Sequence, residues 1–315
     1  MLSAANRVLR DPEIERRVLR LRHEAFDHLD RTVAVAPEPS LKHQAPHIVG
    51  TPPVVAADTV TTDVLRFGIM QHGCVLVRGL VPQDRVDRLI DGIDRAFAAH
   101  DAGAAGAPVS QTTPWFEPFP PATGGAIAIN RRWVRDGGGL WAADSPRVIY
   151  ELLELFEDVG VRQLITDYFG ERPALSVNKC VLRRVPLDVV GDWHQDGAFL
   201  GKGIRSVDVW LALSRCGRDA PGLEFVARRL EHVVDTGTEG AKFSWAVAPD
   251  MIERAAAGAP ISRPIFEPGD ALLFDHFLLH RTARDPGMTR ERYAIETWFF
   301  APSAYPAEGQ IPLVF

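Results

Sequence analysis

The chain of 315 residues predicts a β sandwich or barrel behind a mostly helical front. From Leu175 onward, short runs of β-branched and aromatic residues are separated by Gly, Pro and Asp, which is typical of sandwiches and barrels. Before Leu175, apolar residues mainly recur at helical spacing. The hydrophobic fraction of 46% and the charged fraction of 24% are those of a globular protein with a large buried core.

The helical front begins with an amphipathic segment that we expect to be a peripheral addition. Residues 35–60 follow, and their Pro-rich, aperiodic sequence indicates an extended connection. Further along, Ser145 and Pro146 have the residue types of an N-cap and a first helical position, and Gly170 marks a helix end. The expected elements are helices at 13–30, 63–67 and 84–100, a strand at 74–77, and a helix from Ser145 towards Tyr168.

The β half contains seven short runs that alternate with turn residues. A different segment, residues 101–141, is rich in Gly, Ala, Pro and aromatic residues without a sustained period, which is unusual for a connector. We expect its part from Pro114 to Trp141 to be a lid or pocket wall, or else a packed hydrophobic flap. Its Arg131 and Arg132 could hold an anionic group. The expected strands are 175–183, 192–196, 206–213, 223–226, 261–266, 271–274 and 293–300.

Composition excludes several classes of protein. The formal charge of −6 disfavours binding to nucleic acid or to an anionic membrane surface. No apolar run approaches the roughly 20 residues that span a bilayer. The N-terminus shows no secretory signal, so a cytoplasmic location is expected. Cys74, Cys180 and Cys216 form no CxxC pair and are expected to be buried free thiols. Oligomeric state is not predicted.

The main chemical signal is Trp193-His194-Gln195-Asp196-Gly197, in an expected strand. Residues two apart in a strand point to the same side, so His194 and Asp196 could both reach one metal ion. A second His-x-acid triplet, from His28 to Asp30, lies in an expected helix, where positions i and i+2 diverge. We interpret that triplet as solvated surface.

A facial iron site needs a third ligand, usually a second histidine, and keeps positions open for co-substrate and oxygen. His276 and His280 are the late candidates, after the turn and apolar strand that begin at Pro268. Because they are four residues apart, strand alternation does not choose between them. With His194 and Asp196 in an expected strand, either histidine would complete a set of two histidines and one carboxylate.

An arginine that enters a strand beside such a site could hold a dicarboxylate through two parallel hydrogen bonds. Arg292 is the favoured candidate because Tyr293-Ala-Ile continues as strand. Arg281, Arg284 and Arg290 are interpreted as surface residues, with Arg290 as the fallback for this role.

Taken together, these motifs resemble the phytanoyl-CoA dioxygenase family of iron(II)- and 2-oxoglutarate-dependent oxygenases. The likeness runs from about Asp63 to Pro302. The resemblance implies a mostly β fold with flanking helices around a double-stranded β-helix, or jelly roll. It divides the chain into an N-terminal helix and connection (1–60), a dioxygenase domain (61–302) and a C-terminal tail (303–315). The motifs that carry it are Phe67-Gly68, Cys74-Val-Leu-Val-Arg-Gly-Leu80, Trp193-His-Gln-Asp-Gly197, Asp208-Val-Trp-Leu-Ala-Leu213, Ala220-Pro-Gly-Leu-Glu-Phe225, Pro268-Gly-Asp270, His280 and Arg292-Tyr-Ala-Ile295.

The resemblance also implies roles for individual residues. The implied iron ligands, which are also the catalytic residues, are His194, Asp196 and His280. The distal carboxylate of 2-oxoglutarate would bind Arg292. The other implied cofactor-binding residues are Thr282, two positions after the distal histidine, Trp210 in the co-substrate pocket, Gln195 between the two ligands, and Lys179 near 2-oxoglutarate.

The implied function is a dioxygenase that uses Fe(II), 2-oxoglutarate and O2, and releases succinate and CO2. Its expected reaction is hydroxylation of an unactivated C–H bond of a small molecule; desaturation, epimerisation and ring formation stay open. Halogenation is not expected, because halogenating relatives lack the carboxylate that Asp196 provides. The alternatives are a metal-dependent enzyme that does not use 2-oxoglutarate, and a non-catalytic jelly-roll binding protein.

Overall fold

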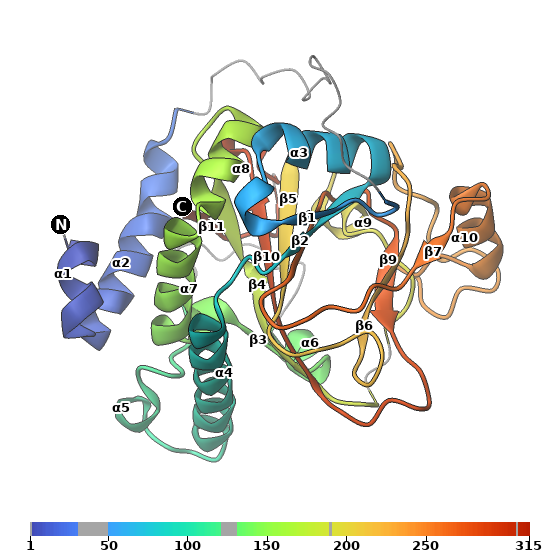
Figure 1. Cartoon of the computed structure of the whole chain (residues 1–315). Helices are drawn as coiled ribbons and strands as arrows, with labels where there is room; N and C mark the ends of the chain where they lie inside the picture. The colour runs from blue at the N-terminus through green and yellow to red at the C-terminus, as the bar shows by residue number, and fades with distance from the viewer. Residues whose placement is uncertain (1, 31–49, 121–130, 189–190, 307) are drawn as a thin grey trace.

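The computed structural model describes residues 2–30, 50–120, 131–188, 191–306 and 308–315. Two sheets face each other at its centre, and helices cover the outer face of the larger sheet (Figure 1). The larger sheet has eight strands in the order β1-β2-β8-β5-β10-β4-β11, with β3 paired to β4; the smaller has the order β7-β6-β9. Together they form a double-stranded β-helix core, so the predicted fold class is confirmed.

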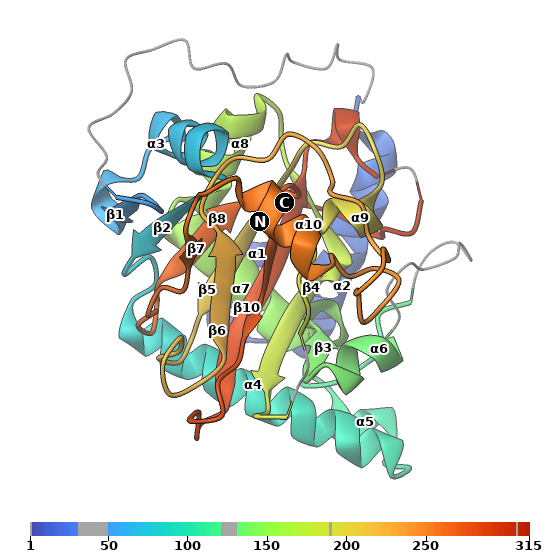
Figure 2. The same ribbon diagram turned by 90° about the vertical axis from the view of Figure 1, so that its right-hand side faces the viewer.

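Most strands coincide with the expected β runs. Figure 2 shows the small sheet in front of the large one. Apart from the parallel pair β1–β2, the paired strands are antiparallel. The strands are β1 Val54–Ala56, β2 Cys74–Arg78, β3 Gly139–Trp141, β4 Ala174–Val185, β5 Ser206–Ala212, β6 Gly222–Val226, β7 Ile261–Ser262, β8 Ala271–Phe274, β9 His280–Ala283, β10 Arg292–Phe300 and β11 Pro312–Val314.

The helices lie mainly on the side of the large sheet that faces away from the small one (Figure 1). Their apolar residues share one core with the outer face of the sheet. The helices are α1 Leu2–Leu9, α2 Pro12–Glu24, α3 Thr62–Phe67, α4 Gln83–Ala104, α5 Val109–Thr112, α6 Arg131–Asp136, α7 Pro146–Asp158, α8 Val161–Phe169, α9 Gly197–Leu200 and α10 Pro249–Ala256.

Strand alternation separates the two faces of the large sheet. On β5, Val207, Val209 and Leu211 point to the helical side and join its core. Trp210 and Ala212 point the other way, into a second core between the sheets. This alternation follows from the two-residue period of a strand. It decides which side chains face the space between the sheets, where the candidate site lies.

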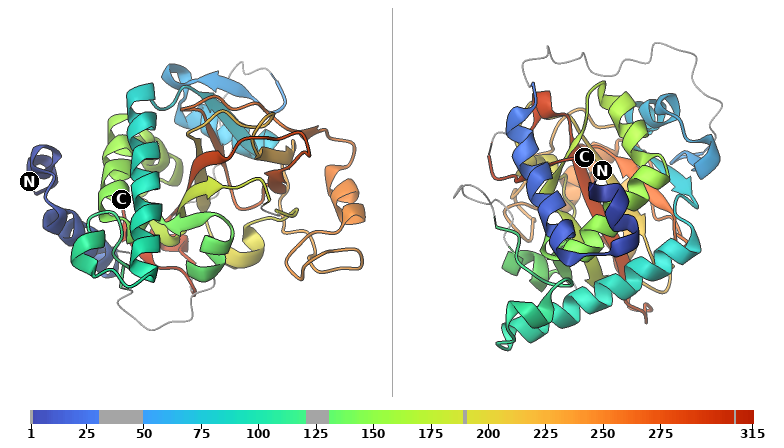
Figure 3. Two further views of the ribbon diagram at one scale, coloured as in Figure 1. Left: turned by 90° about the horizontal axis from the view of Figure 1, so that it is seen from below. Right: turned by 90° about the vertical axis from the view of Figure 1, so that its left-hand side faces the viewer.

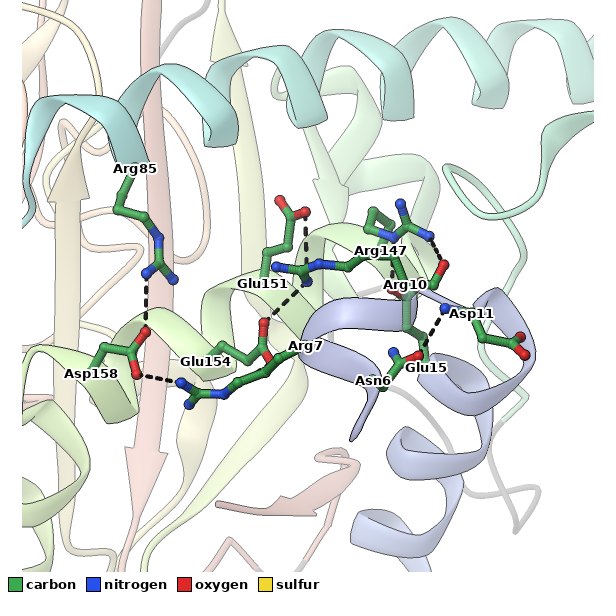
Figure 4. A network of polar contacts seen from close by, with 10 residues as sticks. All are labelled: Asn6, Arg7, Arg10, Asp11, Glu15, Arg85, Arg147, Glu151, Glu154 and Asp158. Carbon is green, nitrogen blue, oxygen red and sulfur yellow. Dashed lines mark hydrogen bonds and ion pairs between the residues drawn. The ribbon is translucent and has the colours of Figure 1, made fainter. Parts of the chain in front are cut away.

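The N-terminal helices are held to α7 by a polar network (Figure 4). Arg147 donates to Glu15, which is fully buried, over 2.6 Å. Arg10 donates to Glu154 over 3.0 Å. Figure 3 shows α1 and α2 outside α7, on the side away from the small sheet. The helix expected at 13–30 is therefore present as α2 and a short 3-10 turn, Ala25–His28, and it is peripheral.

Segments outside the expected dioxygenase domain also join the large sheet. β1, which precedes residue 61, pairs with β2, and β11, which follows residue 302, pairs with β4. Residues 35–49 of the expected connection lie outside the described residues. Both flanking segments thus contribute to the same sheet as the central part of the chain.

One expected helix is two helices in the structure. The sequence predicts a helix from Ser145 towards Tyr168, but α7 ends at Asp158 and α8 begins at Val161. Gly160 lies between them with φ of 78°, a left-handed conformation that glycine adopts without steric penalty. Pro146 occupies the first turn as expected, whereas the Ser145 hydroxyl makes no capping hydrogen bond.

Two further expectations are met within the described residues. Cys74, Cys180 and Cys216 are buried and free, as predicted. None of the described helices is both long enough and apolar enough to cross a bilayer.

Candidate metal and co-substrate site

His194, Asp196 and His280 converge in the space between the two sheets. Each offers a ligand atom, and these atoms all lie within 4.8 Å of one another. His280 Nε2 is 3.6 Å from Asp196 Oδ2, and the two imidazole rings are 4.5 Å apart between centroids. The three residues predicted as metal ligands are therefore neighbours in the fold.

The local structure that joins them differs from the expected one. Residues 192–196 do not form a strand: His194 makes a single β-bridge with His280, through N–H···O bonds of 2.9 and 3.0 Å. Asp196 is already helical, with φ of −62° and ψ of −24°, and precedes α9. The predicted strand is wrong. Asp196 reaches the cluster through the turn into α9, not through strand alternation.

Hydrogen bonds orient both imidazoles. His194 Nδ1 lies 2.8 Å from the carbonyl oxygen of Asp192, and His280 Nδ1 lies 2.9 Å from that of Leu278. A carbonyl oxygen accepts only, so each Nδ1 carries a proton, and in the neutral imidazole Nε2 then keeps a free lone pair. Such backbone partners fix the tautomer of metal-binding histidines. Both rings are thus prepared to act as ligands through Nε2.

Electrostatics favour the charge states that a metal ion requires. Burial, together with the neighbouring His280, lowers the pKa of His194 to about 4, so this imidazole is neutral at pH 7. Burial opposes ionisation of Asp196, but Lys179 and the two histidines hold its pKa below the ordinary value. Two nitrogen donors and one carboxylate form the set that suits non-haem iron(II) with open positions. The donor set fits the metal implied by the resemblance.

His276, the alternative third ligand, lies outside the cluster. Its Nδ1 is 2.8 Å from Ser206 Oγ, and its carbonyl oxygen accepts the Gly197 N–H over 2.9 Å. Residues 275–279 form a turn before β9, so His276 and His280 do not share a strand. Of the two histidines that the argument from parity left open, His280 is therefore the one that lies beside His194 and Asp196.

Arg292 is a buried cation in the same cavity as the triad. It begins β10, is 2% exposed, and its guanidinium lies 5.4 Å from the centroid of Trp210. Its NH1 group contacts the carbonyl oxygens of Pro221 and Gly222 at 3.3 Å, and its Nε has no partner. Among the described residues Arg292 forms no ion pair. A buried guanidinium without a carboxylate fits an external dicarboxylate such as 2-oxoglutarate.

Of the other residues predicted to bind a cofactor, Trp210 and Thr282 lie near Arg292, whereas Lys179 and Gln195 make other contacts. Trp210 and Thr282 line the cavity with Arg292, and Trp210 Nε1 has no hydrogen-bond partner. Arg290, the fallback for Arg292, is exposed in the loop before β10. Trp210 and Thr282 therefore lie where a co-substrate held by Arg292 would contact them.

Lys179 lies on β4, and its ammonium group forms an ion pair with Asp196. Gln195 instead points away from the cavity. Its amide donates to the carbonyl oxygens of His232 and Phe277 and accepts the Val234 N–H. These bonds hold the segment that carries two metal-ligand candidates. A contact between Gln195 and a cofactor stays a prediction.

The cavity that contains these residues has a volume of about 980 Å³. Sequence reasoning missed several residues of its wall. Glu296 accepts two 2.9 Å bonds from Arg183, and alternation along β10 from Arg292 could have placed it there. Phe199, Phe243 and Trp245 also line the cavity, and no sequence pattern predicted this role for them.

The segment expected to be a lid is described in part. Residues 121–130 lie outside the described residues. Arg131 is engaged elsewhere, since it donates to both carboxylate oxygens of Asp144 over 2.7 and 2.8 Å. Trp133 on α6 is 51% exposed and lines the cavity, whereas Trp141 is buried. Within the described part, this segment contributes to the wall through α6.

Comparison with known proteins supports the fold. No family model and no curated protein matches the chain. The fold is similar to that of SnoK, a non-haem α-ketoglutarate dependent carbocyclase from nogalamycin biosynthesis, with 12% identity, a TM-score of 0.50, and coverage of 82% of this chain and 98% of that one. EctD from S. alaskensis, solved with 2-oxoglutarate and 5-hydroxyectoine, is 15% identical to this chain. Its TM-score is 0.47, and the match covers 74% of this chain and 73% of that one. AviO1 from Streptomyces viridochromogenes Tue57 is 16% identical to this chain, with a TM-score of 0.46 and coverage of 76% of this chain and 94% of that one.

Proposed function

We propose that this protein is an iron(II)- and 2-oxoglutarate-dependent oxygenase that hydroxylates a C–H bond of a small molecule. The observation that carries the proposal is one cavity lined by both the His194, Asp196 and His280 cluster and the unpaired, buried Arg292. The resemblance to the phytanoyl-CoA dioxygenase family is consistent with it. Iron(II), 2-oxoglutarate and O2, when bound, supply the oxidising power; succinate and CO2 are the expected by-products.

The residues of the chain have distinct roles in this proposal. His194, Asp196 and His280 hold the metal, and the carbonyl oxygens of Asp192 and Leu278 keep the imidazoles oriented. Lys179 fixes the Asp196 carboxylate through their ion pair.

Arg292 binds the distal carboxylate of 2-oxoglutarate, and its planar guanidinium matches that group in shape and charge. Thr282 and Trp210 border the same part of the cavity. Trp298 and Phe274, both buried, form an apolar part of the cavity wall.

The test is a calorimetric titration of 2-oxoglutarate into anaerobic, iron(II)-loaded protein. Wild type should bind, Arg292→Met should lose binding while keeping the metal, and His280→Ala should lose the metal. Arg290→Ala is the matched control, since its exposed side chain should leave binding unchanged. If metal-loaded wild type does not bind 2-oxoglutarate, the proposal is wrong and the two alternatives remain.

Those alternatives predict different outcomes. A metal-dependent enzyme that does not use 2-oxoglutarate would retain turnover in Arg292→Met. A non-catalytic binding protein would release no succinate with any substrate, even with iron bound. Succinate release in the presence of a candidate substrate separates both from the proposed oxygenase.

A further inference from the structure

Three aromatic side chains form a wall beside the candidate metal site, and we call Phe199, Phe243 and Trp245 the aromatic wall. Trp245 packs edge-on against His194, with centroids 5.8 Å apart and an interplanar angle of 89°. Phe243 stacks on Trp245 at 5.1 Å and 2°, and Phe199 lies 6.1 Å from Trp245. The aromatic wall therefore begins at a metal-ligand candidate and extends outward.

The aromatic wall is held in place and is open to the cavity. The Val247 N–H donates to the carbonyl oxygen of Trp193 over 2.9 Å, which ties the segment to the chain next to His194. All three side chains line the cavity, and Phe243 is 43% exposed. Large aromatic groups that face a cavity mark ligand contacts, since apolar surface is more stable when it is covered.

The charges of the cavity limit what the aromatic wall can face. Among the described residues, each lysine or arginine of the cavity lining other than Arg292 pairs with a carboxylate. The pairs are Lys179–Asp196, Arg183–Glu296, Arg184–Glu291 and Arg135–Asp101.

The acidic side chains that line the cavity also outnumber the basic ones. In the proposed function Arg292 binds 2-oxoglutarate, so no unpaired cation of the described lining remains for a second anion. An anionic group on the substrate would meet repulsion, whereas a neutral or cationic group would not.

We infer that the substrate presents an apolar ring system to the aromatic wall and carries no anionic group. This inference rests on the proposed function, because Arg292 is assigned to 2-oxoglutarate. It excludes carboxylate, phosphate and coenzyme A ester substrates. A cationic group is favoured further by the faces of the aromatic rings; Lys179 Nζ already lies 5.5 Å from the centroid of Phe199.

The test uses three probes with one ring system and different charges: 2-naphthylmethanol, 2-naphthylmethylamine and 2-naphthoate. Each is titrated calorimetrically into anaerobic protein with iron(II) and saturating 2-oxoglutarate. The alcohol and the amine should bind, and 2-naphthoate should bind at least tenfold more weakly. Trp245→Ala should weaken the alcohol and the amine about tenfold. Phe67→Ala, which removes a half-buried aromatic group of α3 away from the cavity, should leave them unchanged.

The outcomes separate this inference from the proposed function. Equal or tighter binding of 2-naphthoate, an unchanged affinity in Trp245→Ala, or no binding of any probe overturns the inference, even when 2-oxoglutarate binds. If 2-oxoglutarate does not bind but the alcohol binds through Trp245, the oxygenase proposal fails and the aromatic wall stands. Arg292→Met lacks the one unpaired cation of the described lining, so 2-naphthoate should also bind weakly to this variant. Strong binding of 2-naphthoate to Arg292→Met would contradict the charge argument.

Discussion

Replacement of Arg292 by methionine should leave the stability of the metal-free protein almost unchanged. Methionine keeps much of the packing of the arginine stem and removes the charge. Removing one partner of a buried ion pair usually costs about 3–5 kcal/mol, because the other charge is left unpaired. Arg292 has no such partner among the described residues, so this cost does not arise.

The expected magnitude follows from the contacts of the guanidinium. Its two contacts with carbonyl oxygens are long, at 3.3 Å, and its cation–π contact with Trp210 spans 5.4 Å. Such contacts contribute about 2–4 kcal/mol together. Burial of an unpaired charge costs several kcal/mol and also lowers the pKa of Arg292. The two effects nearly cancel, so Arg292→Met should change the free energy of unfolding by less than about 1 kcal/mol.

Arg183→Met is the matched comparison. Arg183 makes two 2.9 Å bonds to Glu296, and both side chains are partly buried in the same cavity. Its replacement leaves Glu296 unpaired and should cost about 2–3 kcal/mol, less than for a fully buried pair because solvent screens the charge. Urea unfolding of the metal-free proteins, in buffer without dicarboxylates, measures both changes.

A loss in Arg292→Met as large as that in Arg183→Met would refute the reasoning, because Arg292 would then be a structural residue. A second measurement uses metal-loaded protein. At a 2-oxoglutarate concentration of 100 times the dissociation constant, wild type should gain about 2.7 kcal/mol of stability, and Arg292→Met should gain none.

Three further changes test separate parts of the site. Asp196→Ala should weaken cobalt(II) binding at least about 100-fold in an absorption titration, whereas His276→Ala should not. Burial and the charge of Glu296 raise the pKa of the Asp208 carboxyl. The stability contributed by its neutral form is lost as pH rises, so Asp208→Asn should stabilise the metal-free protein by about 1 kcal/mol at pH 8 and have less effect at pH 5 in urea unfolding. Gln195→Leu should cost about 2–4 kcal/mol by the same assay, since three backbone groups lose partners.

The longer elements of the fold could be predicted because their signal is local. Runs of β-branched and aromatic residues between turn residues identified β5 and β10, and helical spacing identified α4. The shortest strands carry no such signal. β11 spans Pro312–Val314, and its pairing with β4 alone makes it a strand. The break at Gly160 was missed because a single glycine within an apolar period does not by itself end a helix.

The residue types of the site could be predicted from the sequence, but the local structure that brings them together could not. His194, Asp196 and His280 lie close together, although the strand that was expected to align the first two is absent, and their role as metal ligands stays a prediction. Their convergence depends on the pairing of His194 with His280 across the chain, which no local pattern encodes. Trp245 lay outside the prediction for the same reason, since it meets His194 only in the folded protein.

The charged inner face of the large sheet gives the strongest argument for a ligand. Its outer face buries apolar side chains, and part of its inner face joins a second apolar core. Beside that core, Lys179, Arg183 and Glu296 point between the sheets and neutralise one another or a metal-ligand candidate. Arg292 alone of the described cations in this lining has no carboxylate. Proteins retain an unfavourable buried group at functional sites, so the unpaired charge of Arg292 supports the proposal that the carboxylate of 2-oxoglutarate binds beside it.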